Sequence, residues 1–156
     1  MTSYDYNKLY VIAQAACDAV GVSMMELNSS GPELKPPFVA FDIISPHINL
    51  NYLEDDTAGQ FELVCSLTVY DLDKLHAIQT ADNLRQYMAT QAMTDLLLKQ
   101  QAVLVERMPT NIRSVPNVNK TAHMVGFDYR LRVTEPLTEP DKIDTVEIKE
   151  EMPNGK

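Results

Sequence analysis

Histidine and acidic side chains are the residues of this chain that could bind a metal ion. The three histidines, His47, His76 and His123, are far apart and fall in a predicted loop, helix and strand. Zinc sites usually take their ligands at short, regular spacings, which these positions lack. Residues 53–59, LEDDTAG, place three acids side by side, whereas calcium loops need acids at alternate positions and a later bidentate glutamate. The sequence therefore predicts no metal site.

Nucleophilic and phosphate-binding motifs are also missing from the sequence. Cys17 and Cys65 form no CxxC pair, and both lie among apolar residues, which is typical of small buried thiols in a reducing compartment. The sequence alone does not decide whether these two cysteines form a disulfide. There is no GxSxG motif, and the five glycines do not cluster, so neither a serine nucleophile nor a dinucleotide site is indicated. We predict no catalytic residue and no cofactor.

The net charge of the chain disfavours two classes of binding partner. The 156 residues carry a formal net charge of −9, which disfavours general binding to nucleic acid because phosphate contacts need clustered cations. The same charge disfavours an anionic membrane surface. The sequence begins without a basic and apolar leader, and no apolar run reaches the roughly 20 residues of a membrane span. These features predict a soluble protein.

Apolar periodicity predicts two helices and five strands. Residues at spacings of three and four indicate a helix from about Tyr4 to Val20 that ends at Gly21, and a second from Asp71 or Asp73 to about Lys99. The second helix either continues or restarts within TQAMTDLLLKQ. Residues 21–37 are predicted to be a loop. Strands are predicted at 38–45 (ended by Pro46), 60–71, 102–108, 110–116 and 121–135.

This order predicts a single α+β domain. We expect a mainly antiparallel, mixed sheet with two helices packed on one face and the other face open. Residues 1–135 would form the domain. Residues 136–156 change to an acidic, proline-containing sequence that we predict to be an extended C-terminal arm. Within it, KIDTVEIK has strand-like content, and Ile143, Val146 and Ile148 could add a strand to a neighbouring molecule.

A charged strand face is the strongest candidate for a binding surface. In GFDYRLRVTEP, residues 126–136, apolar side chains alternate with Asp128, Arg130 and Arg132. Glu62 lies on the polar side of the strand at 60–71, and Glu62 and Arg113 are possible partners of these three residues. One interpretation is a solvated face with weak cross-strand charge pairs. The other is a subunit interface, which arginine and tyrosine favour.

Three stretches resemble the neck and tail terminator proteins of tailed bacteriophages. PPFVAFDIISP is similar to the family's early strand that ends in a proline, and FELVCSLTVYDLDKLHAIQTADNLRQYM to its long strand running into the main helix. HMVGFDYRLRVTE is similar to its last strand, in which an aromatic, an acid and arginines alternate. The acidic C-terminal arm departs from this pattern.

The resemblance implies a structural role in the virion. Family members form a hexameric ring that caps the tail tube and docks to the head connector. The implied partners are further copies of the chain, the tail tube protein, the sheath of a contractile tail, the head-completion or connector protein, and DNA that passes without sequence-specific binding. Assembly would take place in the cytoplasm of the bacterial host, with no membrane and no cofactor involved. We also expect Arg130→Glu with Arg132→Glu to leave the monomer folded and to block the ring.

Three alternatives stay open. The first is another tail component, such as a tail completion or tube-like protein. The second is a module that binds a small molecule in apolar space between helices and sheet. The third is an enzyme whose site the sequence does not reveal.

Overall fold

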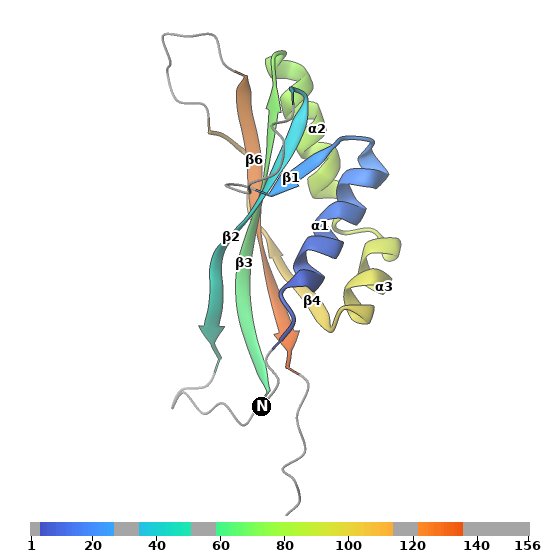
Figure 1. Ribbon diagram of the computed structural model, residues 1–156, viewed down its shortest axis with the longest axis vertical. Helices are drawn as coiled ribbons and strands as arrows, with labels where there is room; N and C mark the ends of the chain where they lie inside the picture. The colour runs from blue at the N-terminus through green and yellow to red at the C-terminus, as the bar shows by residue number, and fades with distance from the viewer. Residues whose placement is uncertain (1–3, 27–34, 51–58, 114–121, 136–156) are drawn as a thin grey trace, which may run out of the picture.

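The computed structural model describes residues 4–26, 35–50, 59–113 and 122–135 (Figure 1). Within these ranges the chain forms three helices and six strands. The helices are α1 (Asn7–Val20), α2 (Lys74–Tyr87) and α3 (Gln91–Lys99). The strands are β1 (Met24–Glu26), β2 (Phe38–Asn49), β3 (Gln60–Asp71), β4 (Ala102–Arg107), β5 (Asn111–Ile112) and β6 (His123–Thr134).

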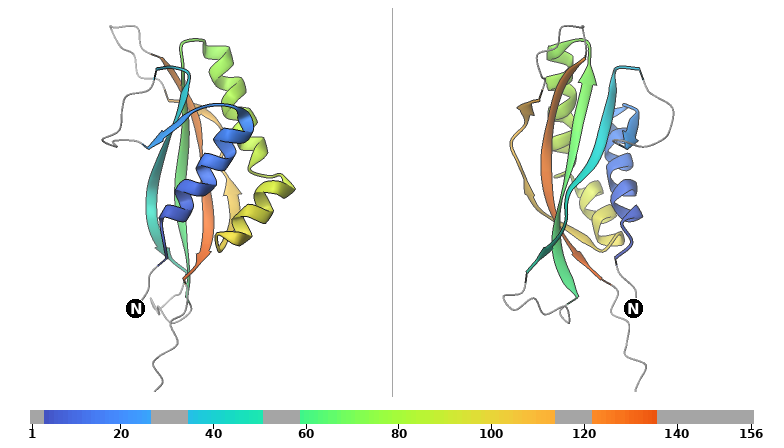
Figure 2. Two further views of the ribbon diagram at one scale, coloured as in Figure 1. Left: turned by 45° about the vertical axis from the view of Figure 1, so that its right-hand side comes forward. Right: turned by 60° about the vertical axis from the view of Figure 1, so that its left-hand side comes forward.

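The strands form one mixed sheet, and the helices cover one of its faces. The strand order is β1-β2-β3-β6-β4, and β5 also pairs with β6. The short β1 is parallel to β2, and the other neighbours are antiparallel. All three helices lie on the same side of the sheet (Figures 1 and 2). The predicted α+β class, with a mainly antiparallel sheet and one open face, is confirmed.

Two helices begin at polar side-chain caps, and α1 ends at a glycine. Gly21 has φ of 86° and its N–H bonds to the carbonyl of Cys17 at 2.9 Å, so the predicted end of α1 is confirmed. Asp73 caps α2 by accepting bonds from the N–H groups of Leu75 and His76. The predicted second helix is two helices, because Thr90 starts α3 as a new N-cap, accepting from the N–H of Met93 at 3.3 Å.

The structure corrects two strand predictions. β1 occupies part of the predicted loop at 21–37, where three residues pair with β2. β2 does not end at Ser45 but continues through Pro46 to Asn49. Proline is tolerated there because the register of β2 against β3 shifts between Ile43 and Ser45 and again between Ser45 and Ile48, and a bulged strand does not need every N–H in its ladder.

The core lies between the helices and the covered face of the sheet. Phe127, Tyr129, Leu131 and Val133 of β6 are each fully buried, as period-two alternation predicted. The expected interior thiols are confirmed too, because Cys17 and Cys65 are free and fully buried. Burial raises the pKa of each thiol to about 12, which keeps both in the unreactive protonated form.

The boundary between a domain at 1–135 and an arm at 136–156 stays a prediction. β6 ends at Thr134, and the description of the chain stops at Glu135.

Candidate functional site: a charge cluster on the helix-free face

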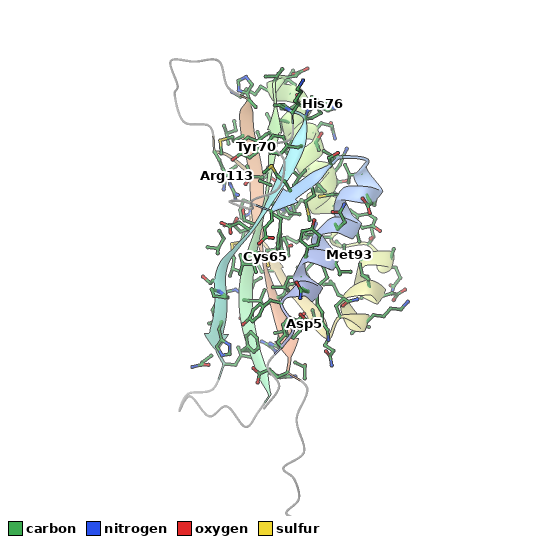
Figure 3. The ribbon with its side chains drawn as sticks, viewed as in Figure 1. Asp5, Cys65, Tyr70, His76, Met93 and Arg113 are labelled. Atoms are coloured by element: carbon green, nitrogen blue, oxygen red, sulfur yellow. The ribbon has the colours of Figure 1, made fainter. Side chains whose placement is uncertain are left out.

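Five charged residues gather on the sheet face that no helix covers. The register of β3 against β6 places Glu62 opposite Arg132 and Ser66 opposite Asp128. These positions alternate with the apolar core residues of the two strands, so their side chains point away from the helices. Figure 3 shows Arg113 on this side of the sheet and Met93 of α3 on the other. We call the group formed by Glu62, Arg113, Asp128, Arg130 and Arg132 the charge cluster.

Glu62 is the most buried member of the charge cluster. Its side chain is 9% exposed and contacts two arginines. Arg132 donates to Oε2 from Nη2 at 2.8 Å and from Nε at 3.2 Å, and Arg130 donates to Oε1 from Nη1 at 3.3 Å. A carboxylate with so little access to water needs such partners, because the cost of removing its hydration is otherwise uncompensated.

Arg113 joins β5 to the two central strands. Its Nη2 donates to Asp128 Oδ1 at 2.7 Å, and its Nη1 donates to the hydroxyls of Ser66 at 2.6 Å and Thr68 at 2.8 Å. Its Nε donates to Asn111 Oδ1 at 2.8 Å. The planar guanidinium can satisfy these acceptors together because its donors are fixed in a fork. Arg113 therefore links the end of β5 to side chains of β3 and β6.

The structure places the five charged residues predicted from sequence in two ion-paired groups, Glu62 with Arg130 and Arg132, and Arg113 with Asp128. It also adds Ser66 and Thr68 as hydrogen-bond partners of Arg113. The other predicted interface residues, Ile143, Val146 and Ile148, lie outside the described residues. Within the charge cluster every arginine has a carboxylate partner in the same subunit. Such a surface is ordered before any partner arrives, and it offers little unpaired positive charge to phosphate.

No metal-binding constellation accompanies the charge cluster. Across the described ranges, no group of three or more His, Cys, Asp or Glu side chains could hold a metal ion. A shallow cavity of about 530 Å³ lies at the C-terminal end of α1, where Gln14, Asp18 and Ser23 are among the lining residues. An apolar groove of about 280 Å³ lies between α3 and β4.

A titratable pair, Asp71 and His76, lies at the junction between β3 and α2. Asp71 is 6% exposed and contacts Nδ1 of His76 through Oδ2. Desolvation raises the pKa of the Asp71 carboxyl, but bonds from the Asp73 N–H and from His76 outweigh it and leave that pKa below its usual value. The hydrogen bond and the negative charge of Asp71 raise the pKa of His76. Figure 3 places His76 at the end of the sheet where α2 starts.

This pair predicts a pH dependence of stability. The pKa of His76 is higher in the folded state than in the unfolded state, so its contribution is complete below the unfolded pKa of about 6.5. That contribution is lost as the pH rises through the folded pKa. Thermal unfolding followed from pH 6 to 8.5 should therefore show a modest fall in Tm. The two buried thiols begin to ionise in the unfolded chain near the top of this window and add a slope of their own. That slope is common to the parent protein and to a His76 variant, so their difference reports His76 alone.

The control for this prediction is His76→Asn, which removes the titrating ring and should flatten the fall in Tm over the same window. An equal slope in the variant and the parent protein would show that His76 is not responsible.

The comparison with protein families identifies the chain. A family model described as phage neck terminator protein matches residues 7–155. The chain belongs to the phage neck terminator family. A comparison with curated proteins found no match. Among the residues that the structure describes, no helix is both long enough and apolar enough to span a membrane.

Membership confirms the resemblance seen in the sequence. The phage neck terminator match covers all three helices and all six strands described above. It indicates a structural protein of the bacteriophage virion that associates with other head and tail proteins, and such a role implies no enzymatic activity.

Proposed function

We propose that this neck terminator protein forms a closed ring that ends the tail tube and docks to the head connector. The observation that carries the proposal is the family match over residues 7–155. The ring would be a hexamer by resemblance, and it would assemble in the host cytoplasm before it becomes part of the virion neck. Its partners would be the tube protein, the sheath of a contractile tail, and the head-completion or connector protein.

The helix-free face is the proposed contact between subunits. A ring needs a heterologous contact, in which one surface of a subunit meets a different surface of the next and the rotation closes. Arginine is enriched in such contacts. Arg132 remains 47% exposed although it is paired, so its guanidinium can reach a neighbouring acceptor without losing Glu62. Pairing within the subunit also limits the side-chain entropy lost on association.

DNA passage agrees with the charge of the chain. A net charge of −9 disfavours adhesion of the phosphate backbone to the ring. The arginines of the charge cluster already contact carboxylates of their own subunit. A duplex could therefore pass through the ring without sequence-specific binding.

Electron microscopy of the purified protein, alone and with tail tubes, tests this function. We expect closed rings only, seated at tube ends, and tubes that no longer elongate once capped. Open stacks of the pure protein would instead support a tube-like component. A protein that neither forms rings nor binds tubes would contradict the proposal. A ligand-dependent rise in Tm would then favour the small-molecule-binding module.

A further inference from the structure

β4 is an open edge of the sheet. It pairs with β6 on one side, and no described strand lies on its other side. Val103 is 53% exposed and Val105 is 44% exposed. An edge strand that presents β-branched side chains is a ready template for another strand, and proteins usually cover or charge such an edge. In β4, charge appears only at Glu106 and Arg107.

An apolar groove lies beside this edge, between α3 and β4. Leu97, Leu98, Val103 and Leu104 are among its lining residues, and its volume is about 280 Å³. Leu98 is 60% exposed. The edge and the groove together offer backbone hydrogen bonds and a place for apolar side chains, which are the two needs of an added strand.

The far end of β4 is already occupied. Arg85 of α2 donates from Nη2 to the carbonyl of Arg107 at 3.1 Å and from Nε to the carbonyl of Met108 at 2.9 Å. Arg107 in turn donates to the carbonyl of Arg85 at 3.0 Å. The open part of the edge is therefore Ala102–Glu106.

The C-terminal arm contains a sequence suited to pair with such an edge as an added strand. Residues 136–156 continue the chain from the end of β6, and they include KIDTVEIK at 142–149. Period-two alternation puts Val146 and Ile148 on one side of a strand and Ile143 on the other. Acids are interspersed at Asp144 and Glu147, and Lys99 and Arg132 carry positive charge at the ends of α3 and β6 next to β4.

We propose that residues 142–149 of one subunit bind as an added strand along Ala102–Glu106 of a second copy of this chain. Val146 and Ile148 would cover the α3–β4 groove, and Ile143 would cover the exposed valines. The choice of a second copy as the partner depends on the proposed ring function, in which that copy is the neighbouring subunit. The contact goes beyond that proposal, because it names both the inserted segment and the edge that receives it.

The exit of the chain favours a second copy over the same subunit. β6 ends at the lower end of the sheet in Figure 1, where the Thr134 N–H bonds to the carbonyl of Gln101 at 3.0 Å. To reach its own β4 edge the chain would have to reverse at once and cross the start of β4. Pro136 follows immediately, and a residue before proline prefers extended backbone. Extended residues 136–142 could span about 20 Å, which reaches an adjacent molecule.

Cross-linking in the full-length protein tests the contact. Val103→Cys or Val105→Cys chains are mixed with Ile143→Cys, Val146→Cys or Ile148→Cys chains under mild oxidation. The native thiols are fully buried and will not compete. Val11→Cys on α1, 45% exposed in the parent residue, is the matched control. Paired strands bring Cα atoms within disulfide range, so at least one pairing should give about tenfold more dimer than the control.

Three results would overturn the inference. They are no cross-link in any of the six pairings, a yield equal to that of Val11→Cys, and an exclusively intramolecular disulfide when both cysteines are placed in one chain. Rings are scored on tube ends in the same samples. Rings without cross-links would refute the arm contact and leave the proposed function standing. Cross-linked chains without rings would support the arm contact and refute the proposed function.

Discussion

Replacing Gly126 with alanine is expected to destabilise the folded subunit by about 3 kcal/mol, near the upper end for overpacking. A Cβ added at Gly126 would lie 2.3 Å from the carbonyl oxygen of Leu67 and 2.8 Å from Cα of Thr68. Both are backbone atoms of β3, which pairs with β6 along twelve register positions. The obstacle therefore cannot move aside as a flexible side chain would. Urea unfolding should show a lower midpoint with an unchanged slope.

Gly21→Ala is the matched comparison for this substitution. Gly21 has a positive φ of 86°, and a Cβ there would meet nothing within 4 Å. Its cost should come from the left-handed backbone alone, about 1–2 kcal/mol. If Gly126→Ala costs no more than Gly21→Ala, the close approach of β3 and β6 is not the cause.

The double substitution Arg130→Glu with Arg132→Glu is expected to have the second large effect on folding stability. From sequence alone we expected this variant to stay folded, but the structure gives a reason to expect a loss of about 2 kcal/mol. Three carboxylates would then meet around Glu62, whose side chain is 9% exposed, and breaking a buried ion pair costs 3–5 kcal/mol. The estimate is lower because Arg130 and Arg132 are 30% and 47% exposed and water screens them.

Adding Glu62→Lys to this pair of substitutions separates folding from assembly. The triple variant restores opposite charges with reversed polarity, so most of the lost stability should return. A neighbouring subunit would still meet reversed charge, and we expect the triple variant to be folded but unable to form rings or cap tubes. Rings formed by the stable triple variant would contradict the helix-free face as the subunit contact.

Alternation and capping residues made much of the fold predictable. The apolar side of β6 follows directly from the spacing of Phe127, Tyr129, Leu131 and Val133, since strand geometry leaves them one direction. Gly21 ended α1 because it is the residue that takes a left-handed cap without strain. The break between α2 and α3 was less clear in the sequence, because Thr90 caps a helix without the glycine or proline that usually marks a stop.

Sequence-based predictions from local patterns were wrong where pairing with another strand determined the secondary structure. Pro46 predicts the end of β2, yet two register shifts against β3 allow the strand to continue past it. Met24–Glu26 has no strand signal strong enough to outweigh its surroundings, and it becomes β1 only because β2 offers an open edge. Sheet pairing joins residues that are far apart in the chain, which a periodicity cannot encode.

By itself, the sequence determined the α+β class, the buried face of β6, the charged residues of the opposite face and the similarity to phage neck terminators. Composition and short-range periodicity carry that information. Only the tertiary structure decided that Glu62 lies between two arginines, that Arg113 contacts Asp128 and two hydroxyls, and that β4 has an open edge beside an apolar groove. These depend on register and strand order, which are set when distant segments pack together.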